Sequence, residues 1–451
     1  MPRPFLLPLI ERIARQPGAG AALGLLFLLP LMFNPGWYSH DELQWAAHAQ
    51  PLEGAAASAG WLEWQRFQYR PLTFQLWLWL SAALFDSPRL YHAVFALLGL
   101  CVALGVRRCL QAWGWGPARA LLAMGLFLVC PYAVFVHAWV ATLADLLWVG
   151  VGLAMATLLA PLRDRLGITR ALMLVVLCTL ALLAKESALS LAALAVVLAL
   201  ATRRRAHLLA ALVVAVPTLI YLALRLPVIL GQPGDAIYGW SPLWPPLRLL
   251  QYLLFPFALN VEEIQALPLA STGRLALAAL GLLLFWAGLW RGLGALRAAL
   301  WLLAAAAALG PVLALSATAN QYGYGLAAVL AAAASRALPA RAGMGSVLLA
   351  FALGVMLLKG LQVQAHMLDA GHASARFLPG VSEALRQRSA DTVLVLSSAH
   401  SGRDWLYARL LTDLPHYAGT PIGQRVRVQD SDEGADLRIL DDGSLHPIDP
   451  P

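Results

Sequence analysis

Long apolar runs separated by short polar stretches follow one another along most of the chain. We interpret eleven of these runs as membrane-spanning helices. They cover residues 19–33, 90–106, 119–136, 146–162, 171–184, 187–202, 207–225, 275–290, 298–315, 322–336 and 345–361. The pattern predicts an all-α polytopic membrane domain over residues 1–362, with about 11 transmembrane helices.

A further apolar run, residues 71–85, is not counted as a span. At 15 residues it is short for a hydrocarbon core about 30 Å thick. Counting it would also place every later group of arginines on the opposite side of the membrane. We therefore predict a helix in the outer interface, where Trp77 and Trp79 are favourable. Residues 247–261 form either a second interfacial helix or a further span, and the arginines favour the interfacial helix.

Basic residues between the runs predict how the chain crosses the membrane. With eleven spans, sixteen arginines lie on the side of the N-terminus, at positions 3, 12, 15, 107, 108, 119, 163, 165, 170, 203, 204, 205, 291, 297, 336 and 341. Seven basic residues lie in the short loops of the other side, at positions 66, 70, 89, 185, 225, 248 and 274. Because basic loop residues accumulate in the cytoplasm, we expect a cytoplasmic N-terminus and a periplasmic C-terminus. The preference for arginine over lysine hints at a bacterial source, hence at the inner membrane.

Residues 363–451 differ in character, because charged residues become ordinarily frequent there. The stretch 392–397 is typical of a strand, and a helix is expected near 403–414. Two further strand-like stretches follow, the second with a turn signal at Asp442-Gly443. We predict a small α+β periplasmic domain without a catalytic constellation of its own.

Composition excludes several classes of protein. Of 451 residues, 60% are hydrophobic and 12% are charged, against about 25% charged in soluble domains. A soluble enzyme, a disordered chain and a disulfide scaffold do not have this composition. The net charge of +8 comes from arginine groups between apolar runs, so we assign them to topology and expect no nucleic-acid partner.

Candidate chemistry begins in the first outer loop, residues 34–89. Ser39 and Glu42 form a capping-box pattern, which predicts a short helix starting at His40. On that helix four side chains share one face, namely Asp41, Gln44, Trp45 and His48. Asp41 and Glu42 are catalytic candidates, and His48 is a candidate for substrate binding. The alternative is that both carboxylates only satisfy the start of the helix.

More ionisable residues gather at the outer ends of the predicted spans, where charge is costly and often functional. Asp145 in the second outer loop is a third catalytic candidate. Arg70 lies beside a predicted apolar groove and Lys185 lies at a hairpin turn, and both positions suit binding of a lipid phosphate. The alternative is that these residues form ion pairs with a purely structural role. These phosphate-binding candidates are Arg70, Lys185 and Glu186, and Tyr69 and His137 are further candidates for substrate binding.

Four short motifs occur in a fixed order. They are Asp41-Glu42 in the first outer loop, Arg70-Pro71-Leu72 at the start of the interfacial helix, Ala144-Asp145 at the end of the second outer loop and Ala184-Lys185-Glu186 at a turn. Together they resemble the GT-C superfamily of membrane glycosyltransferases, with the protein O-mannosyltransferases and bacterial aminoarabinose transferases as the nearest group. The resemblance covers about residues 20–205.

The resemblance implies transfer of a sugar from a polyprenyl-phosphate donor to a lipid, glycan or protein acceptor on the periplasmic face. Asp41 would be the general base, which predicts inversion at the sugar carbon. Arg70 and Lys185 would bind the phosphate of the donor. No cofactor is expected. The chain has no DxD motif, so a family-type metal site is unsupported, although His40, His48 and His137 could join Asp41 or Asp145 around a divalent cation.

Other functions fit the same sequence. A transporter or flippase of lipid-linked sugars is the main alternative, but such proteins commonly carry charged residues or broken helices near the bilayer midplane, whereas the predicted spans are nearly free of charge. An O-antigen ligase or polymerase usually has its large outer loop late in the chain. A non-catalytic cell-envelope assembly protein would use Asp41 and Glu42 only as helix caps.

Overall fold

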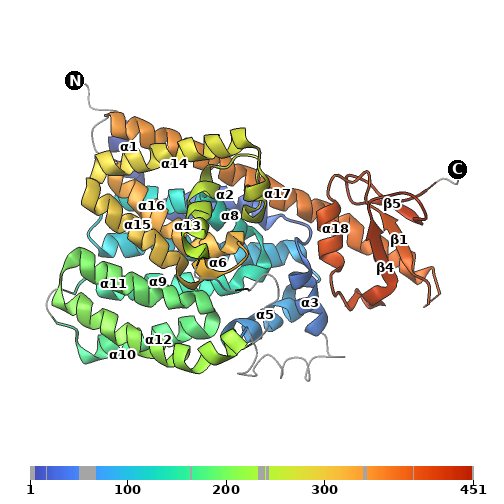
Figure 1. Ribbon diagram of the computed structural model, residues 1–451, viewed down its shortest axis with the longest axis horizontal. Helices are drawn as coiled ribbons and strands as arrows, with labels where there is room; N and C mark the ends of the chain where they lie inside the picture. Colours follow the sequence, from blue (N-terminus) through green and yellow to red (C-terminus); the bar gives the residue numbers. More distant parts are fainter. Residues whose placement is uncertain are drawn as a thin grey trace.

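The computed structural model describes residues 6–16, 18–49, 68–162, 165–231, 239, 243–338, 343–389 and 391–448. Helices lie side by side in a bundle, and a small α/β unit stands at one end of it (Figure 1). Helix α17 runs out of the bundle into this unit. Four arginines used for the topology prediction, at positions 3, 66, 163 and 341, lie outside the described residues.

Most of the bundle consists of apolar helices. They are α1 (Leu6–Arg15), α2 (Ala19–Met32), α5 (Pro71–Leu84), α6 (Pro88–Ala112), α7 (Pro117–Val129), α8 (Pro131–Ala138), α9 (Leu143–Leu159), α10 (Ile168–Ala184), α11 (Ser190–Thr202), α12 (Arg205–Gly231), α13 (Trp244–Leu254), α14 (Thr272–Leu293), α15 (Ala295–Leu309), α16 (Tyr324–Ala337) and α17 (Met344–Arg386). The sequence analysis did not predict α1. The interfacial helix expected at 71–85 coincides with α5.

All eleven apolar runs fall on helical segments, which mark the chain as a helical membrane protein. Within the described residues, however, six helices are long and apolar enough to cross a membrane, or seven when α7 and α8 count as one bent span. The expected eleven spans are therefore not confirmed. Six of the runs form α-helices of only 13 to 17 residues, namely α2, α9, α10, α11, α15 and α16. Of these, α9 and α15 reach 20 residues when the adjoining 3-10 segments are included. Helix α13 has 11 residues and rises only about 16 Å, so it is too short to cross a bilayer.

Several helices break, and short 3-10 segments stand at the breaks. The segment expected to be one span at 119–136 bends by 65° between α7 and α8. Pro131 lacks an N–H group and restricts the preceding residue, and Cys130 accordingly has an extended backbone (φ −64°, ψ 130°). Further breaks carry the segments η1 (Val140–Thr142), η2 (Glu186–Leu189), η5 (Gly310–Ala314) and η6 (Asn320–Gly323).

The C-terminal unit contains a four-stranded sheet in the order β4-β1-β5-β6. Strand β1 (Leu394–Ser397) pairs in parallel with β4 (Val426–Gln429) and β5 (Leu437–Ile439), and β5 pairs antiparallel with β6 (Leu445–Pro447). Helix α18 (Asp404–Leu411) follows β1, and a two-residue ladder joins β2 (His416–Tyr417) to β3 (Thr420–Pro421). The expected strands, helix and Asp442-Gly443 turn are confirmed. The boundary expected after residue 362 falls inside α17, because apolar packing of this helix continues beyond the last span.

The segment after α2 begins with a close contact on α17. The amide of Trp37 donates to Ser374 Oγ at 2.7 Å, and Asn34 Nδ2 donates to the carbonyl of Met367 at 3.5 Å. A Cβ atom on Gly371 would lie 1.7 Å from the Oδ1 atom of Asn34. Only a residue without a side chain permits this approach, which fixes the start of the loop that leads to helix α3 (His40–His48).

We therefore expect Gly371→Ala to destabilise the protein by about 1–3 kcal/mol through overpacking. Gly354→Ala is the matched control, because Gly354 lies in the same helix and a Cβ there would meet nothing within 4 Å. The measurement is the thermal unfolding midpoint of both variants in lipid. Equal midpoints would contradict the close contact.

Candidate functional site

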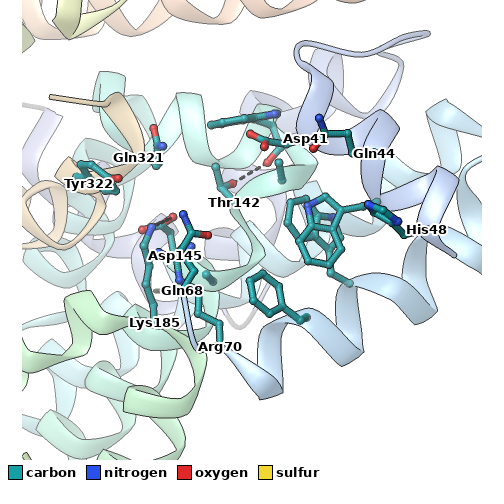
Figure 2. A pocket seen from close by; sticks show the side chains of 16 residues that line it. Asp41, Gln44, His48, Gln68, Arg70, Thr142, Asp145, Lys185, Gln321 and Tyr322 are labelled. Atoms are coloured by element: carbon teal, nitrogen blue, oxygen red, sulfur yellow. Dashed lines mark hydrogen bonds and ion pairs between the residues drawn. The ribbon is translucent and has the colours of Figure 1, made fainter. Parts of the chain in front are cut away.

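A cavity of about 550 Å³ lies where α3, α5 and several broken helices meet. Figure 2 shows its polar side chains on opposite sides, with Asp41 and Gln44 on one side and Arg70, Asp145 and Lys185 on the other. The lining residues are Asp41, Gln44, Trp45, His48, Gln68, Arg70, Phe74, Trp77, Trp139, Ala141, Thr142, Ala144, Asp145, Lys185, Gln321 and Tyr322.

Helix α3 forms one wall of the cavity. It begins at His40 with the predicted capping box, in which Ser39 Oγ accepts from the Asp41 amide and Glu42 Oε2 accepts from the amides of Ser39 (2.6 Å) and Tyr38 (3.0 Å). The capping is therefore complete without the carboxylate of Asp41. That side chain is 39% exposed and lies 3.6 Å from His40 Nε2. The four side chains expected on one face of this helix all line the cavity.

A buried ion pair forms the deep wall. Lys185 Nζ donates to Asp145 Oδ2 at 2.5 Å, and both side chains are less than 5% exposed. Trp148 Nε1 donates to Asp145 Oδ1, and the Lys185 ammonium lies 5.0 Å from the ring centre of Tyr322. Lys185 has an extended backbone between α10 and η2, so the break in the helix directs its side chain toward the start of α9. The pair keeps a cation available in surroundings that would not tolerate it alone.

A second ion pair stands beside it. Arg70 Nε lies 2.8 Å from Glu186 Oε2, and these side chains are 16% and 19% exposed. Arg70 precedes Pro71 at the start of α5, and Thr73 Oγ1 in the same turn donates to the carbonyl of Ala184. The two contacts fasten the start of α5 to the end of α10, so that Arg70 and Lys185 line the cavity together.

Stacked aromatic rings form the third wall. Trp45 of α3 stacks on Trp77 of α5 with ring centres 4.2 Å apart, and on Phe74 with centres 4.7 Å apart. Such faces bind the apolar C–H face of a flat or ring-shaped ligand and exclude water. The cavity therefore combines one exposed carboxylate, two paired cations and an apolar platform.

Sequence reasoning missed part of the lining. Gln321 and Tyr322 belong to η6, which precedes α16, and the expected span beginning at 322 had assigned Tyr322 to the membrane. The polar pair Asn320-Gln321 between two apolar runs was the available signal. Thr142, Gln68 and Trp139 were also missed, because nothing in the local sequence relates them to Asp41.

Four candidate residues lie outside the lining. Glu42 is buried beneath α3 as its cap, and Glu186 acts through Arg70. Tyr69 lies with its ring 5.4 Å from the guanidinium of Arg225. His137 is fully buried, and its Nε2 atom lies 2.8 Å from the hydroxyl of Tyr324. The structure therefore brings together Asp41, His48, Arg70, Asp145 and Lys185.

Among the described residues, no three histidine, cysteine or carboxylate side chains are grouped so that they could hold a metal ion. His137 contacts the hydroxyl of Tyr324, and Asp145 is engaged by Lys185. The arrangement of charges favours binding of an anion by the cations and acceptance of a proton by the carboxylate. Comparison with known proteins gave no match to a family model, a curated protein or a solved structure.

Removal of one partner of the Lys185–Asp145 pair is expected to be costly. Lys185→Met leaves the Asp145 carboxylate buried without its cation, so we expect a loss of about 3–5 kcal/mol. The double variant Asp145→Leu, Lys185→Met should recover most of this loss. Arg376→Met is the control, because its pair with Asp442 is largely exposed. The measurement is thermal unfolding of the wild type and these three variants in lipid, and a double variant no more stable than Lys185→Met would contradict the buried pair.

Burial raises the pKa of Glu42 to about 8, although the amides of Ser39 and Tyr38 act in the opposite direction. Because this pKa is above that of the unfolded chain, the folded protein keeps a proton that the unfolded chain releases. The resulting stabilisation is complete below about pH 4.5 and is lost as the pH rises to about 8. Glu42→Gln replaces the titrating carboxyl group, so it removes this dependence of the folding stability on pH. The unfolding midpoint of the variant minus that of the wild type should therefore grow from pH 5 to pH 8, and a difference that stays constant over this range would contradict the raised pKa of Glu42.

Proposed function

We propose that this protein is a GT-C-type membrane glycosyltransferase, which transfers a sugar from a polyprenyl-phosphate donor to a lipid, glycan or protein acceptor. The observation that carries the proposal is the single cavity that brings Asp41 together with Arg70 and Lys185. These residues come from three separate segments of the chain. A carboxylate facing two cations suits a reaction in which a hydroxyl loses a proton and a phosphate leaves.

The donor phosphate binds between Arg70 and Lys185. A guanidinium offers several N–H donors to phosphate oxygens, and an ammonium adds a compact charge. Glu186 and Asp145 hold these cations in place while the site is empty and share them when the phosphate is bound. Glu186 and Asp145 thus orient the phosphate-binding groups, and the sugar ring rests against Trp45 and its aromatic neighbours.

Asp41 accepts the proton of the acceptor hydroxyl as its oxygen attacks the anomeric carbon. The bond from that carbon to the phosphate oxygen breaks, and its electron pair leaves with the phosphate. Lys185 and Arg70 stabilise the charge that develops on the leaving group. Attack from the face opposite the phosphate inverts the configuration of the sugar carbon. Within the proposal, the cavity opens on the periplasmic side and the lipid tail of the donor stays in the membrane.

Asp41→Asn tests the proposal directly. A base that loses its charge should lower the rate of transfer by about 10²–10⁴-fold, while binding of the donor and the unfolding midpoint stay unchanged. The fold should tolerate the change, because Ser39 and Glu42 form the helix cap. The measurement is sugar transfer from a polyprenyl-phosphate donor by purified protein in lipid.

Asp86→Asn is the matched control, since Asp86 is exposed between α5 and α6 and does not line the cavity. Undiminished transfer by Asp41→Asn would remove Asp41 from the mechanism. Movement of a labelled donor across the bilayer, without transfer by the wild type, would show a flippase instead.

A further inference from the structure

Helix α18 of the C-terminal unit lies against the part of the chain that bears Asp41 (Figure 1). Gln44 Nε2, in the middle of α3, donates to the carbonyl of Thr412 directly after α18, at 3.0 Å. Gln44 also lines the cavity. The C-terminal unit therefore contacts the helix that carries the candidate base.

Arg409 of α18 makes the stronger contact. Its Nη1 atom lies 2.9 Å from Glu263 Oε1, and its guanidinium lies 4.6 Å from the ring centre of Tyr38 and 5.9 Å from that of Trp139. The hydroxyl of Tyr38 donates to the same Glu263 oxygen. One guanidinium thus holds together the loop before α3, a cavity-lining tryptophan and the segment around residue 263.

Tyr38 is the residue through which this contact reaches the site. Its ring is 2% exposed, and its amide donates to Glu42 within the capping box of α3. Burial and the Glu263 carboxylate raise the pKa of Tyr38 well above its usual value, so the hydroxyl keeps its proton and remains a donor. Displacement of Tyr38 would shift the first turn of α3, which includes Asp41.

We propose that Arg409 is a positioning residue of the site: by holding Tyr38 and Trp139, the C-terminal unit sets the place of α3 over the cavity. The effect on catalysis rests on the proposed function, whereas the effect on α3 does not. Arg409 does not itself line the cavity. It acts through Tyr38.

Other contacts keep the unit attached when Arg409 is removed. Arg403 binds Asp369 of α17 through two hydrogen bonds of 2.6 and 2.7 Å. Trp405 stacks on His366 of the same helix, with ring centres 5.1 Å apart. A variant of Arg409 is therefore expected to retain α18 on α17, so that the test reports on α3 and not on loss of the unit.

The test compares the full chain in lipid with Arg409→Met, Arg409→Lys and the control Arg388→Met. Arg388 pairs with Asp436 at 3.0 Å within the C-terminal unit and is remote from α3 in the chain. Amide hydrogen exchange over residues 40–48 needs no substrate. We expect at least tenfold faster exchange there in Arg409→Met, an intermediate change in Arg409→Lys and none in Arg388→Met, with exchange over 404–411 unchanged.

The second readout is transfer of sugar from a polyprenyl-phosphate donor. Arg409→Met should lower kcat by about 10²-fold and leave the KM for the donor within about threefold, because misplacement of a base affects the chemical step. Arg409→Lys should recover part of kcat, since it keeps the charge over the ring of Tyr38.

Unchanged exchange over residues 40–48 in Arg409→Met would overturn the proposal, whatever the activity. Faster exchange with an unchanged kcat would also overturn it, since α3 would then move without consequence for the reaction. Should the wild type transfer no sugar, the proposed function fails, and the exchange data alone decide whether Arg409 positions α3.

Discussion

The ion pair of Lys185 with Asp145 is the interaction on which the rest of the site depends. A lone charge at that depth would have to shed its proton or draw in water, whereas the pair lets a cation persist between apolar helices. The pair joins the break after α10 to the start of α9, and the Arg70–Glu186 pair then fastens α5 to the same break. The cavity is the space left between these fastened segments and α3.

Broken helices are what make such a space polar. An unbroken apolar helix satisfies its own backbone and offers only apolar side chains to its neighbours, whereas a break directs side chains and backbone dipoles into a common volume. Pro131, the extended backbone of Lys185 and the 3-10 segments η1, η2 and η6 supply these breaks on different helices. The charged side chains that line the cavity, Asp41, Arg70, Asp145 and Lys185, accordingly lie at the ends of helices.

Local signals explain what could be predicted from the sequence. The capping box fixed the first residue of α3, and its periodicity placed Asp41, Gln44, Trp45 and His48 in one lining. Apolar runs located the helices, but eleven spans are not confirmed, because hydropathy does not show where a run bends or ends early. The sequence analysis did not predict the roles of Gln321 and Tyr322 in the lining or the contact of Arg409 with Tyr38. These residues lie more than 250 positions after α3 in the chain, and contacts over such distances leave no local pattern.

The length of helix α17 has a mechanical consequence. Its 43 residues form one helix about 65 Å long, roughly twice the thickness of a hydrocarbon core, so a bilayer could hold only about half of its length. A helix in a bilayer adjusts its tilt to the local thickness, and a tilt of about 10° would displace the end of the other half by about 6 Å. The C-terminal unit is hydrogen-bonded to α17 and also to α3. A change in bilayer thickness that tilts α17 would therefore also displace α3, which forms one wall of the cavity.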